Sequence, residues 1–387
     1  MTIPLSSPDI TSLERAAVLR VLAGPTLSLG PCVGEFEAAL ASFTGTRYAV
    51  AVNSGTSALH LCVKAAGLGP GDEVITSPFS FVASSNCILF ERAVPVFVDI
   101  DPVTLNLDPA RIEAAITPRT RAILPVHVFG RPCDMTAIVD IAKRHNLVII
   151  EDSCEALGSS IDGRAAGAWG AMGTFAFYPN KQITTGEGGA VVTDDPALAA
   201  LCRSWRNQGR GESGAWLQHE RMGYNYRLSD INCALGTAQM ARLPEIVEKR
   251  SRVAENYGRA LRHLDELILP PPAPPGVTIS WFVYVVTLRP EFSRDHRDQI
   301  LSDLRASGIG CNNYFSPIHL QSYFVDSFGY RPGDFPLTES VSARTIALPF
   351  FNALSASEID TVASVLSASL ERLRFAGVTR RAVALAK

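Results

Sequence analysis

From residue 48 onward the sequence repeats one local pattern, which restricts the fold more than any other feature. A short run rich in β-branched residues is followed by a turn and then by a longer stretch with helical periodicity. The predicted strands are 48–53, 72–77, 94–100, 121–129 and 147–152, and the predicted helices are 56–67, 80–92, 108–116 and 134–145. Strands that alternate with helices indicate an α/β protein with a mostly parallel, helix-covered sheet.

The second half of the chain adds further elements. Strands are predicted at 173–178 and 189–194, and a long helix at 229–263. The proline-rich stretch 270–275 is typical of a stiff connector between two domains. Beyond it we expect a small α+β domain, with a strand at 281–288, helices at 294–307 and 356–373, and a polar aromatic loop at 311–323.

The composition excludes several classes of protein. Of 387 residues, 47% are apolar and 19% are charged, which is incompatible with a disordered chain. The 35 basic and 38 acidic residues give a net charge of −3, so we expect no nucleic-acid binding. The eight cysteines form no C-x-x-C pair and are interpreted as reduced thiols. We find no signal peptide and no membrane-spanning apolar run, so we expect a soluble, cytoplasmic protein that binds no membrane.

Ligand chemistry is expected just beyond the carboxyl ends of the predicted strands, where open sheets of this kind bind their ligands. After the first strand, the segment 53–59 (NSGTSAL) opens a helix and offers backbone N–H groups and hydroxyls. Such a helix N-terminus is suited to a phosphate group. Taken alone, the same residues fit an ordinary helix cap equally well.

Two further positions carry reactive side chains. Asp152 ends an apolar strand, where a carboxylate fits a metal ligand, a base, a partner for a cationic ring or a cap for the next loop. Lys181 follows an aromatic strand and precedes the glycine-rich segment 186–189. A partly buried lysine suits a Schiff base, although most single lysines are solvated. Together these groups match the phosphate, ring nitrogen and aldehyde of pyridoxal 5′-phosphate (PLP), with Phe81 stacking on the ring; we predict PLP and no metal site.

The sequence also resembles the DegT/StrS family of PLP-dependent sugar-nucleotide aminotransferases. The matching motifs, in the order of the family, are SGTSALHL, SPFSFVASSN, PVFVDID, PVHVFG, IIEDSCEALG, FYPNKQITTGEGG and GYNYRLSDIN. The resemblance implies the aspartate-aminotransferase-like fold type I. A large PLP-binding domain with a mostly parallel seven-stranded sheet would span 1–245, N-terminal segment included, and a smaller C-terminal α+β domain would span 246–387.

The resemblance further implies roles for individual residues. Lys181 would be catalytic, forming the internal aldimine and carrying a proton between the substrate and cofactor carbons. Asp152 would keep the pyridinium nitrogen protonated. Because one phosphate contact would come from the neighbouring subunit, the protein would be an obligate homodimer with shared active sites. The other implied cofactor contacts are Gly55, Thr56 and Ser57 at the phosphate, Phe81 on the ring, and Asn225 of the partner subunit.

Two cofactor positions depart from the family pattern. Ala176 stands where many members carry a phosphate-binding serine, and Glu155 stands where glutamine or histidine often contacts the cofactor. We expect the remaining donors to hold the phosphate. The predicted substrate-binding residues are Arg227, Tyr314 and His319. Arg227 belongs to an arginine-rich segment suited to a diphosphate or a carboxylate, although such arginines could equally lie at the surface or at a subunit interface.

These residues predict a transaminase acting on small molecules. L-Glutamate would donate its amino group and leave as 2-oxoglutarate, and a nucleotide-linked keto sugar would accept that group. The segment 183–189 (ITTGEGG) is more similar to members acting at C4 of a 4-keto-6-deoxy sugar than to those acting at C3. The alternatives are a 3-keto sugar or cyclitol as acceptor, a related PLP lyase or dehydratase, and a non-enzymatic regulatory relative.

Overall fold

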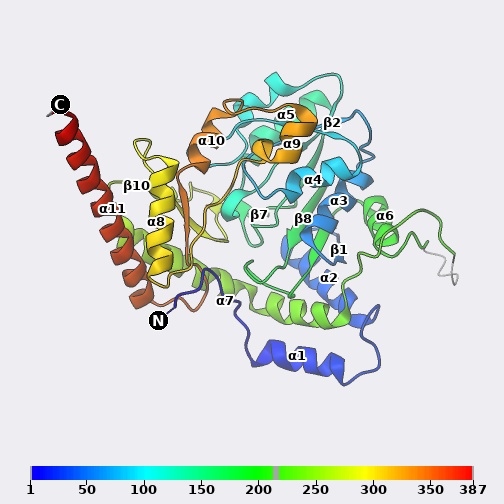
Figure 1. The fold of residues 1–387 in the computed structure, drawn as a ribbon. Helices are drawn as coiled ribbons and strands as arrows, with labels where there is room; N and C mark the ends of the chain where they lie inside the picture. Colours follow the sequence, from blue (N-terminus) through cyan, green and yellow to red (C-terminus); the bar gives the residue numbers. More distant parts are fainter. Residues whose placement is uncertain (1, 212–217, 386–387) are drawn as a thin grey trace.

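A seven-stranded sheet in the order β1-β9-β8-β5-β4-β2-β3 organises the larger part of the chain (Figure 1). The computed structural model describes residues 2–211 and 218–385, with side chains as far as residue 374. All seven strands run in the same direction except β9, which is antiparallel to both of its neighbours, so the predicted sheet is confirmed. The strands are β1 (Tyr48–Val52), β2 (Glu73–Thr76), β3 (Val94–Phe97), β4 (Thr120–Leu124), β5 (Val148–Asp152), β8 (Met172–Ala176) and β9 (Gly189–Thr193).

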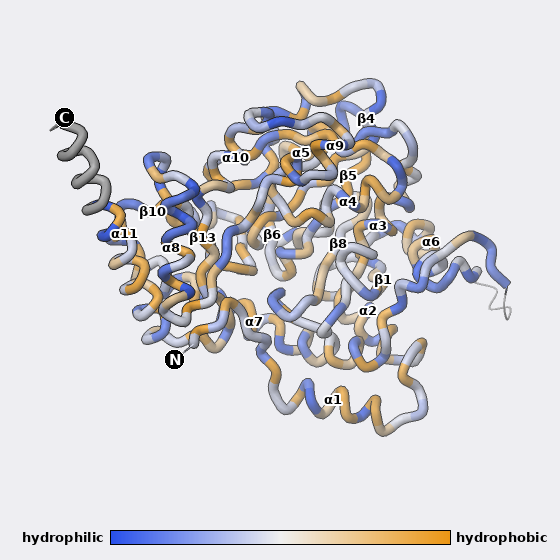
Figure 2. Tube along the Cα trace, viewed as in Figure 1, coloured by the Kyte–Doolittle hydropathy of each residue, from blue (hydrophilic) through white to orange (hydrophobic). Residues whose placement is uncertain are grey.

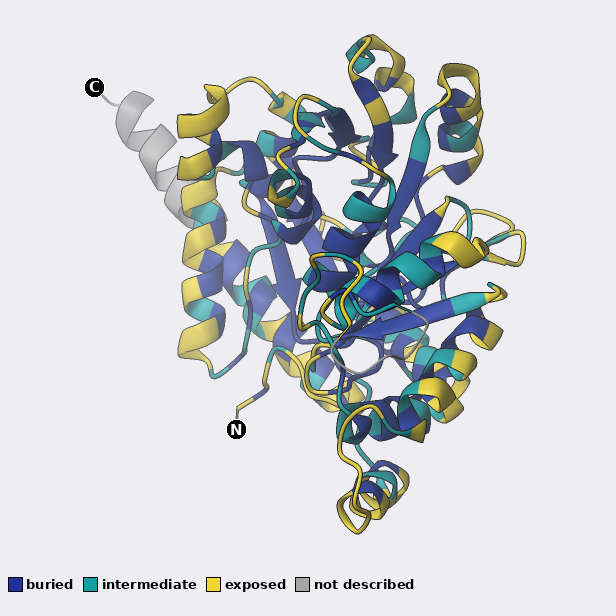
Figure 3. Ribbon diagram, turned by 90° about the vertical axis from the view of Figure 1, so that its right-hand side faces the viewer, coloured by how far each residue is buried: buried dark blue, intermediate teal, exposed yellow. Residues whose placement is uncertain are grey.

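Helices cover both faces of this sheet. Successive side chains along each strand point to opposite faces, and both faces carry apolar residues that must be buried. Val50 packs into the core under α3, whereas Ala49 faces the core under α2. In Figure 3 the strands are buried between helices whose outer sides are exposed. One face carries α3 (Gly55–Ala65), α4 (Ala83–Phe90) and α6 (Pro196–Arg206); the other carries α2 (Pro31–Thr44), α5 (Met135–His145) and the first half of α7 (Asp230–Leu261).

A second, smaller core lies beyond the far end of α7. Its antiparallel sheet consists of β10 (Leu267–Ile268), β12 (Tyr284–Leu288) and β13 (Thr345–Leu348), packed against α8 (Arg294–Ala306) and α11 (Ala356–Leu385). Tyr257 of α7 stacks on Tyr284 with ring centroids 4.9 Å apart and donates a hydrogen bond of 2.8 Å to the Pro349 carbonyl. The predicted domain boundary at 245/246 falls inside α7. Ile246, just after it, still packs in the large unit, whereas Val253, two turns further along, packs in the small one.

The first residues of the N-terminal segment, which was predicted as part of the large domain, hydrogen-bond to the small unit. The amide of Ile3 donates to the Gly308 carbonyl at 2.9 Å, and Gly310 donates back to Ile3 at 2.8 Å. The chain then forms α1 (Ser12–Leu22), which packs along α7 (Figure 1). The remaining elements are β6 (Ser160–Ile161), β7 (Arg164–Ala165), β11 (Val277–Thr278), α9 (Ser322–Phe328) and α10 (Pro336–Ser342).

Two predicted elements differ from the structure for local reasons. The predicted helix 108–116 is a pair of 3-10 turns, Pro109–Arg111 and Glu113–Ala115, because the chain must leave helical geometry before Pro118 and too few residues remain for an α-helix. The predicted strand 121–129 ends at Leu124, where Pro125 offers no N–H to the ladder.

Hydrophobic residues lie along the strands and hydrophilic residues lie in the outer turns (Figure 2). Within the described part of the chain, no helix is both long and apolar enough to span a bilayer.

Candidate active site

A cavity of about 370 Å³ opens at the carboxyl edge of the large sheet. The parallel strands end at this edge, and β9 begins there because Val52 and Ala176 both pair with Gly189. Loops that follow three different strands therefore meet around one space. The lining residues include Ser54, Gly55 and Thr56 after β1, Asp152, Cys154 and Glu155 after β5, Ala176, Tyr178, Asn180, Lys181, Glu187 and Gly188 after β8, Phe81 and Ser84 at α4, and Phe282, Tyr314 and Phe315 from the second half of the chain.

The N-terminus of α3 forms one end of the cavity. Ser54 caps this helix, since its Oγ accepts the Ser57 N–H at 3.1 Å. The N–H groups of Gly55 and Thr56 precede the first intrahelical hydrogen bond and have no acceptor within the helix. A Cβ on residue 55 would lie 2.7 Å from the Cβ of Ala176, so only glycine lets the helix start so close to β8. The cavity thus contains a ready anion site.

Ser57 lies differently from the other two predicted phosphate contacts. Its side chain is buried, and its Oγ donates to the Asn53 side chain at 2.7 Å. Gly55 and Thr56 line the cavity, and Ser54, which the sequence analysis did not select, lines it as well. Ser57 therefore supports the start of α3, whereas Ser54 and Thr56 are the hydroxyl residues of this turn that line the cavity.

Asp152 forms the wall between the strand ends, and its carboxylate is 5% exposed. Ser84 donates to Oδ2 at 2.7 Å and the Cys154 N–H donates to Oδ1 at 3.1 Å. Among the described side chains no cation forms a salt bridge with Asp152, although a buried carboxylate is costly without one. A protonated ring nitrogen would supply that missing positive charge.

Lys181 and Glu155 face each other across the cavity floor. The Lys181 Nζ lies 3.5 Å from Oε1 of Glu155 and 3.9 Å from the ring centroid of Phe282. The Phe129 N–H donates to Oε2 of Glu155 at 2.9 Å. Burial raises the pKa of the Glu155 carboxyl group, and the neighbouring Lys181 offsets part of that effect. The structure thus brings the predicted lysine and its acidic neighbour into direct contact.

The aromatic residues and Asn225 complete the predicted set. Phe81 is 61% exposed and lines the cavity. Tyr314 and Phe315 stack on each other and line it as well. Burial raises the pKa of the Tyr314 hydroxyl. Asn225 does not line the cavity of its own chain; its side chain is exposed, while the adjacent Tyr226 carbonyl accepts the Asn53 N–H at 2.9 Å. An exposed position beside the α3 cradle is compatible with a contact to a neighbouring subunit.

Two predicted substrate residues lie outside the cavity. Arg227 donates to the Asn207 side chain at 3.0 Å. His319 is fully buried, and its Nε2 lies 3.0 Å from Oε1 of Glu339. Burial lowers the pKa of His319, since it disfavours the charged imidazole. Because its ring is packed among aromatic residues, we do not retain the substrate role predicted for His319.

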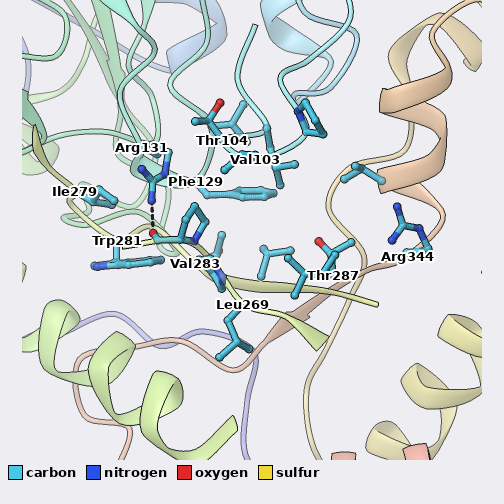
Figure 4. Close-up of a pocket in the computed structure, with 18 of the residues that line it drawn as sticks. Val103, Thr104, Phe129, Arg131, Leu269, Ile279, Trp281, Val283, Thr287 and Arg344 are labelled. Atoms are coloured by element: carbon cyan, nitrogen blue, oxygen red, sulfur yellow. Dashed lines mark hydrogen bonds between the residues drawn. The ribbon is translucent and has the colours of Figure 1, made fainter. Parts of the chain in front are cut away.

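A second cavity of about 370 Å³ lies between the two units (Figure 4). Phe129, Trp281 and Val283 form its walls, and Arg131 at its rim donates to the carbonyl of Pro271 in the predicted proline connector. No lysine or carboxylate is among its described lining residues, so it lacks the groups that PLP requires. It shares Phe129 with the active-site region, since the backbone of that residue binds Glu155.

Several residues of the active-site cavity were not predicted from the sequence. Ser84 and Cys154 lie within the quoted motifs SPFSFVASSN and IIEDSCEALG, so the signal was present but their contacts with Asp152 were not. The lining residues Asn180, Glu187 and Phe282 were missed because nothing local shows which loop side chains turn inward.

Comparisons with known proteins agree with the groups found in this cavity. Residues 8–367 match the model of the DegT/DnrJ/EryC1/StrS aminotransferase family. The chain is 39% identical to GDP-perosamine synthase of Caulobacter vibrioides, over 94% of this chain and 97% of that protein. It is 38% identical to the spore coat polysaccharide biosynthesis protein SpsC of Bacillus subtilis, over 93% and 95%. A solved structure from Streptococcus pneumoniae, described as a sugar aminotransferase in its PLP-form, has a TM-score of 0.91 at 27% identity and covers 96% of this chain and 99% of that chain.

Proposed function

The chain belongs to the DegT/DnrJ/EryC1/StrS aminotransferase family, and from that premise we propose that it uses bound PLP to transfer the amino group of L-glutamate to a nucleotide-linked keto sugar. The protein is a sugar aminotransferase with fold type I, as predicted. The observation that carries the proposal is one cavity that combines the α3 N-terminus, the buried carboxylate of Asp152 and the amine of Lys181. Each of these groups matches one functional group of PLP.

Different residues of this chain would bind different parts of the cofactor. When bound, PLP supplies an aldehyde that reacts with amines and a ring that withdraws electrons. The N–H groups of Gly55 and Thr56 would bind the phosphate, and Asp152, held by Ser84, would accept the ring N–H. Lys181 would hold the cofactor covalently, and its amine is the group that would carry the substrate proton.

The segment that follows Lys181 is the basis for proposing which keto sugar accepts the amino group. We infer a 4-keto-6-deoxy sugar because 183–189 is similar to that of family members acting at C4, and Glu187 of this segment lines the cavity. No arginine is among the described residues that line the cavity, so the diphosphate needs a cation from elsewhere.

A homodimer would supply that cation together with Asn225. The segment 221–227 carries Arg221, Asn225 and Arg227 and is tied to the end of β1. Met222 of this segment is 77% exposed. Phe90 of α4 is 51% exposed and contacts His60, which in turn contacts Tyr224 of the segment. We propose that this surface packs on a second copy of the chain, so that each copy completes the active site of the other.

The test begins with the visible absorption spectrum of the purified protein. Under the proposal, PLP gives a band that L-glutamate bleaches, and borohydride reduction leaves the pyridoxyl mass on Lys181. The Lys181→Ala variant should fold but lose both the band and all turnover. If added PLP produced no band, the cofactor assignment would be wrong. A band that glutamate does not bleach would instead indicate a different donor or lyase chemistry. Comparing nucleotide-linked 4-keto and 3-keto sugars as acceptors then tests the choice of sugar.

A further inference from the structure

The buried carboxylate of Glu155 is fixed against the amine of Lys181. The two side chains are 7% and 14% exposed, and 3.5 Å separates Oε1 from Nζ. Because Oε2 accepts the Phe129 N–H at 2.9 Å, the carboxylate cannot turn away from the lysine without losing that hydrogen bond. The Lys181 amine also lies over the face of Phe282, which favours a cation at the same place.

Lys181 is the one cation within ion-pair distance of Glu155 among the described residues. The other titratable groups near Glu155 are Asp152 and Cys154 on its own segment and Tyr314 on the loop that packs over it. The turn at 128–130 and the segment 280–282 add no ionisable side chain. Burial raises the pKa of Glu155, the charge of Lys181 lowers it, and the charge of Asp152 raises it again.

We propose that Glu155 controls the proton on Lys181: it is the counter-ion of the ammonium form and the proton acceptor when the amine must be free. This inference rests on the proposed function, since both the covalent link to PLP and the later proton transfer need an unprotonated lysine. The Nζ–H bond breaks and an Oε1–H bond forms, while no electron changes hands. The pair is neutral before and after, so the transfer leaves no uncompensated charge in the buried site.

A glutamine at position 155 could not take up that proton. Glu155→Gln is therefore the informative variant, because it keeps the shape and the acceptor for the Phe129 N–H while removing the proton site. Glu155→Asp keeps a carboxylate and tests whether the charge restores the behaviour. The matched control is Glu73→Gln, a buried glutamate that pairs with Arg119 and Thr117 at the amino end of β2, on the opposite edge of the sheet.

The first readout uses the full chain without cofactor. Acylation of Lys181 by limiting acetic anhydride is followed against pH by peptide mass, with exposed Lys143 as the internal standard. Glu155→Gln should move the midpoint of Lys181 reactivity to lower pH, because the ammonium form loses the carboxylate that lies 3.5 Å away. Glu155→Asp and Glu73→Gln should keep the wild-type midpoint. Equal shifts in the Gln and Asp variants would reveal a structural effect and overturn the proposal.

The second readout is the infrared difference spectrum on loading with PLP. Once the lysine is consumed, the wild type should show the C=O stretch of one protonated carboxyl group, which is absent in Glu155→Gln and present in Glu73→Gln. No such band in a protein whose visible spectrum shows bound PLP would overturn the proposal. Failure to take up PLP would instead overturn the proposed function, and the acylation midpoints would still decide whether Glu155 governs the lysine proton.

Discussion

At the scale of single residues, the neighbouring carboxylates Glu151 and Asp152 have different roles. Glu151 points to one side of β5, where it accepts hydrogen bonds from the backbone of Gly167, Trp169 and Gly170 and contacts His127. Asp152 points to the other side, into the cavity, and accepts hydrogen bonds from two donors among the described residues. Alternation along a strand separates them, so the first shapes a loop and the second remains available for a ligand.

Ser84 is the residue that holds Asp152 in place. Its Oγ donates to Oδ2 at 2.7 Å from a buried position on α4. Ser84→Ala removes a charge-assisted hydrogen bond, so we expect about a tenfold weaker cofactor affinity and a similar loss of kcat. A PLP titration followed by fluorescence and steady-state transamination measure both quantities.

Ser85 provides the control for that substitution. It is the next residue on α4, and its buried hydroxyl has no hydrogen-bond partner among the described residues. Ser85→Ala should leave affinity and kcat unchanged. If the two variants behaved alike, the contact between Ser84 and Asp152 would have no role in the site.

At the scale of elements, the start of α3 depends on glycine for space. A methyl group on residue 55 would meet the Cβ of Ala176 at 2.7 Å and the Sγ of Cys154 at 3.1 Å. Gly55→Ala should therefore displace the free N–H groups and weaken PLP binding at least about tenfold. Gly34→Ala on α2 meets no atom within 4 Å and should stabilise the fold by up to about 1 kcal/mol. Calorimetry measures the stability of the two variants, and cofactor titration measures their affinity for PLP. Normal PLP binding by Gly55→Ala would show that the N–H groups at the start of α3 do not bind the phosphate.

The packing of α1 on α7 predicts a response to acid. Burial alone would raise the pKa of Glu14, but hydrogen bonds from Thr11, Arg242 and Gln239 outweigh it and lower the pKa from 4.5 to about 2. A lowered pKa stabilises the fold above the unfolded-state value, and this contribution is lost as the pH falls through the folded-state value. The free energy of unfolding should therefore decline between pH 4.5 and about 2.

Glu14→Gln should remove this response. At neutral pH we expect a loss of about 2 kcal/mol relative to wild type, and in acid a shallower decline, both measured by urea unfolding at several pH values. The control is Glu248→Gln, which removes an exposed pair with Arg252 on the same helix α7. An unchanged acid slope in Glu14→Gln would show that the network does not act through this carboxylate.

The order of the elements could be predicted from sequence because each strand is a β-branched run bounded by turn residues, as in 147–152. Boundaries were wrong where proline or a short span decided the outcome, as in 108–116. Within the site, the strand ends made Lys181 and Asp152 candidates, but their roles were predicted only from the combined set of groups and from the family resemblance. His319 could not be assigned, since its orientation is set by Glu339, twenty positions away in the sequence. Ser84 reaches Asp152 only through the tertiary fold.

At the scale of the whole molecule, the cavity belongs to both units. The sheet supplies the lysine and the carboxylates, and Phe282 and Tyr314, which lie beyond the proline connector, close the cavity from the other side. Asp9 ties the units together, because it pairs with Arg242 and Lys249 of α7 and accepts from Asn352. The relative position of the units therefore sets the width of the site.

The proposed sharing of active sites between subunits makes a quantitative prediction. In a hybrid dimer of Lys181→Ala and Asn225→Ala subunits, one site carries both substitutions and the other carries neither, provided that Asn225 acts across the interface. The purified hybrid, isolated with two different affinity tags, should then show about half the wild-type activity per dimer, although the Lys181→Ala homodimer is inactive and the Asn225→Ala homodimer is impaired. If Asn225 served its own subunit, the hybrid would instead retain half of the impaired activity. Steady-state assays of the three dimers at saturating PLP therefore decide whether the site is complete within one chain.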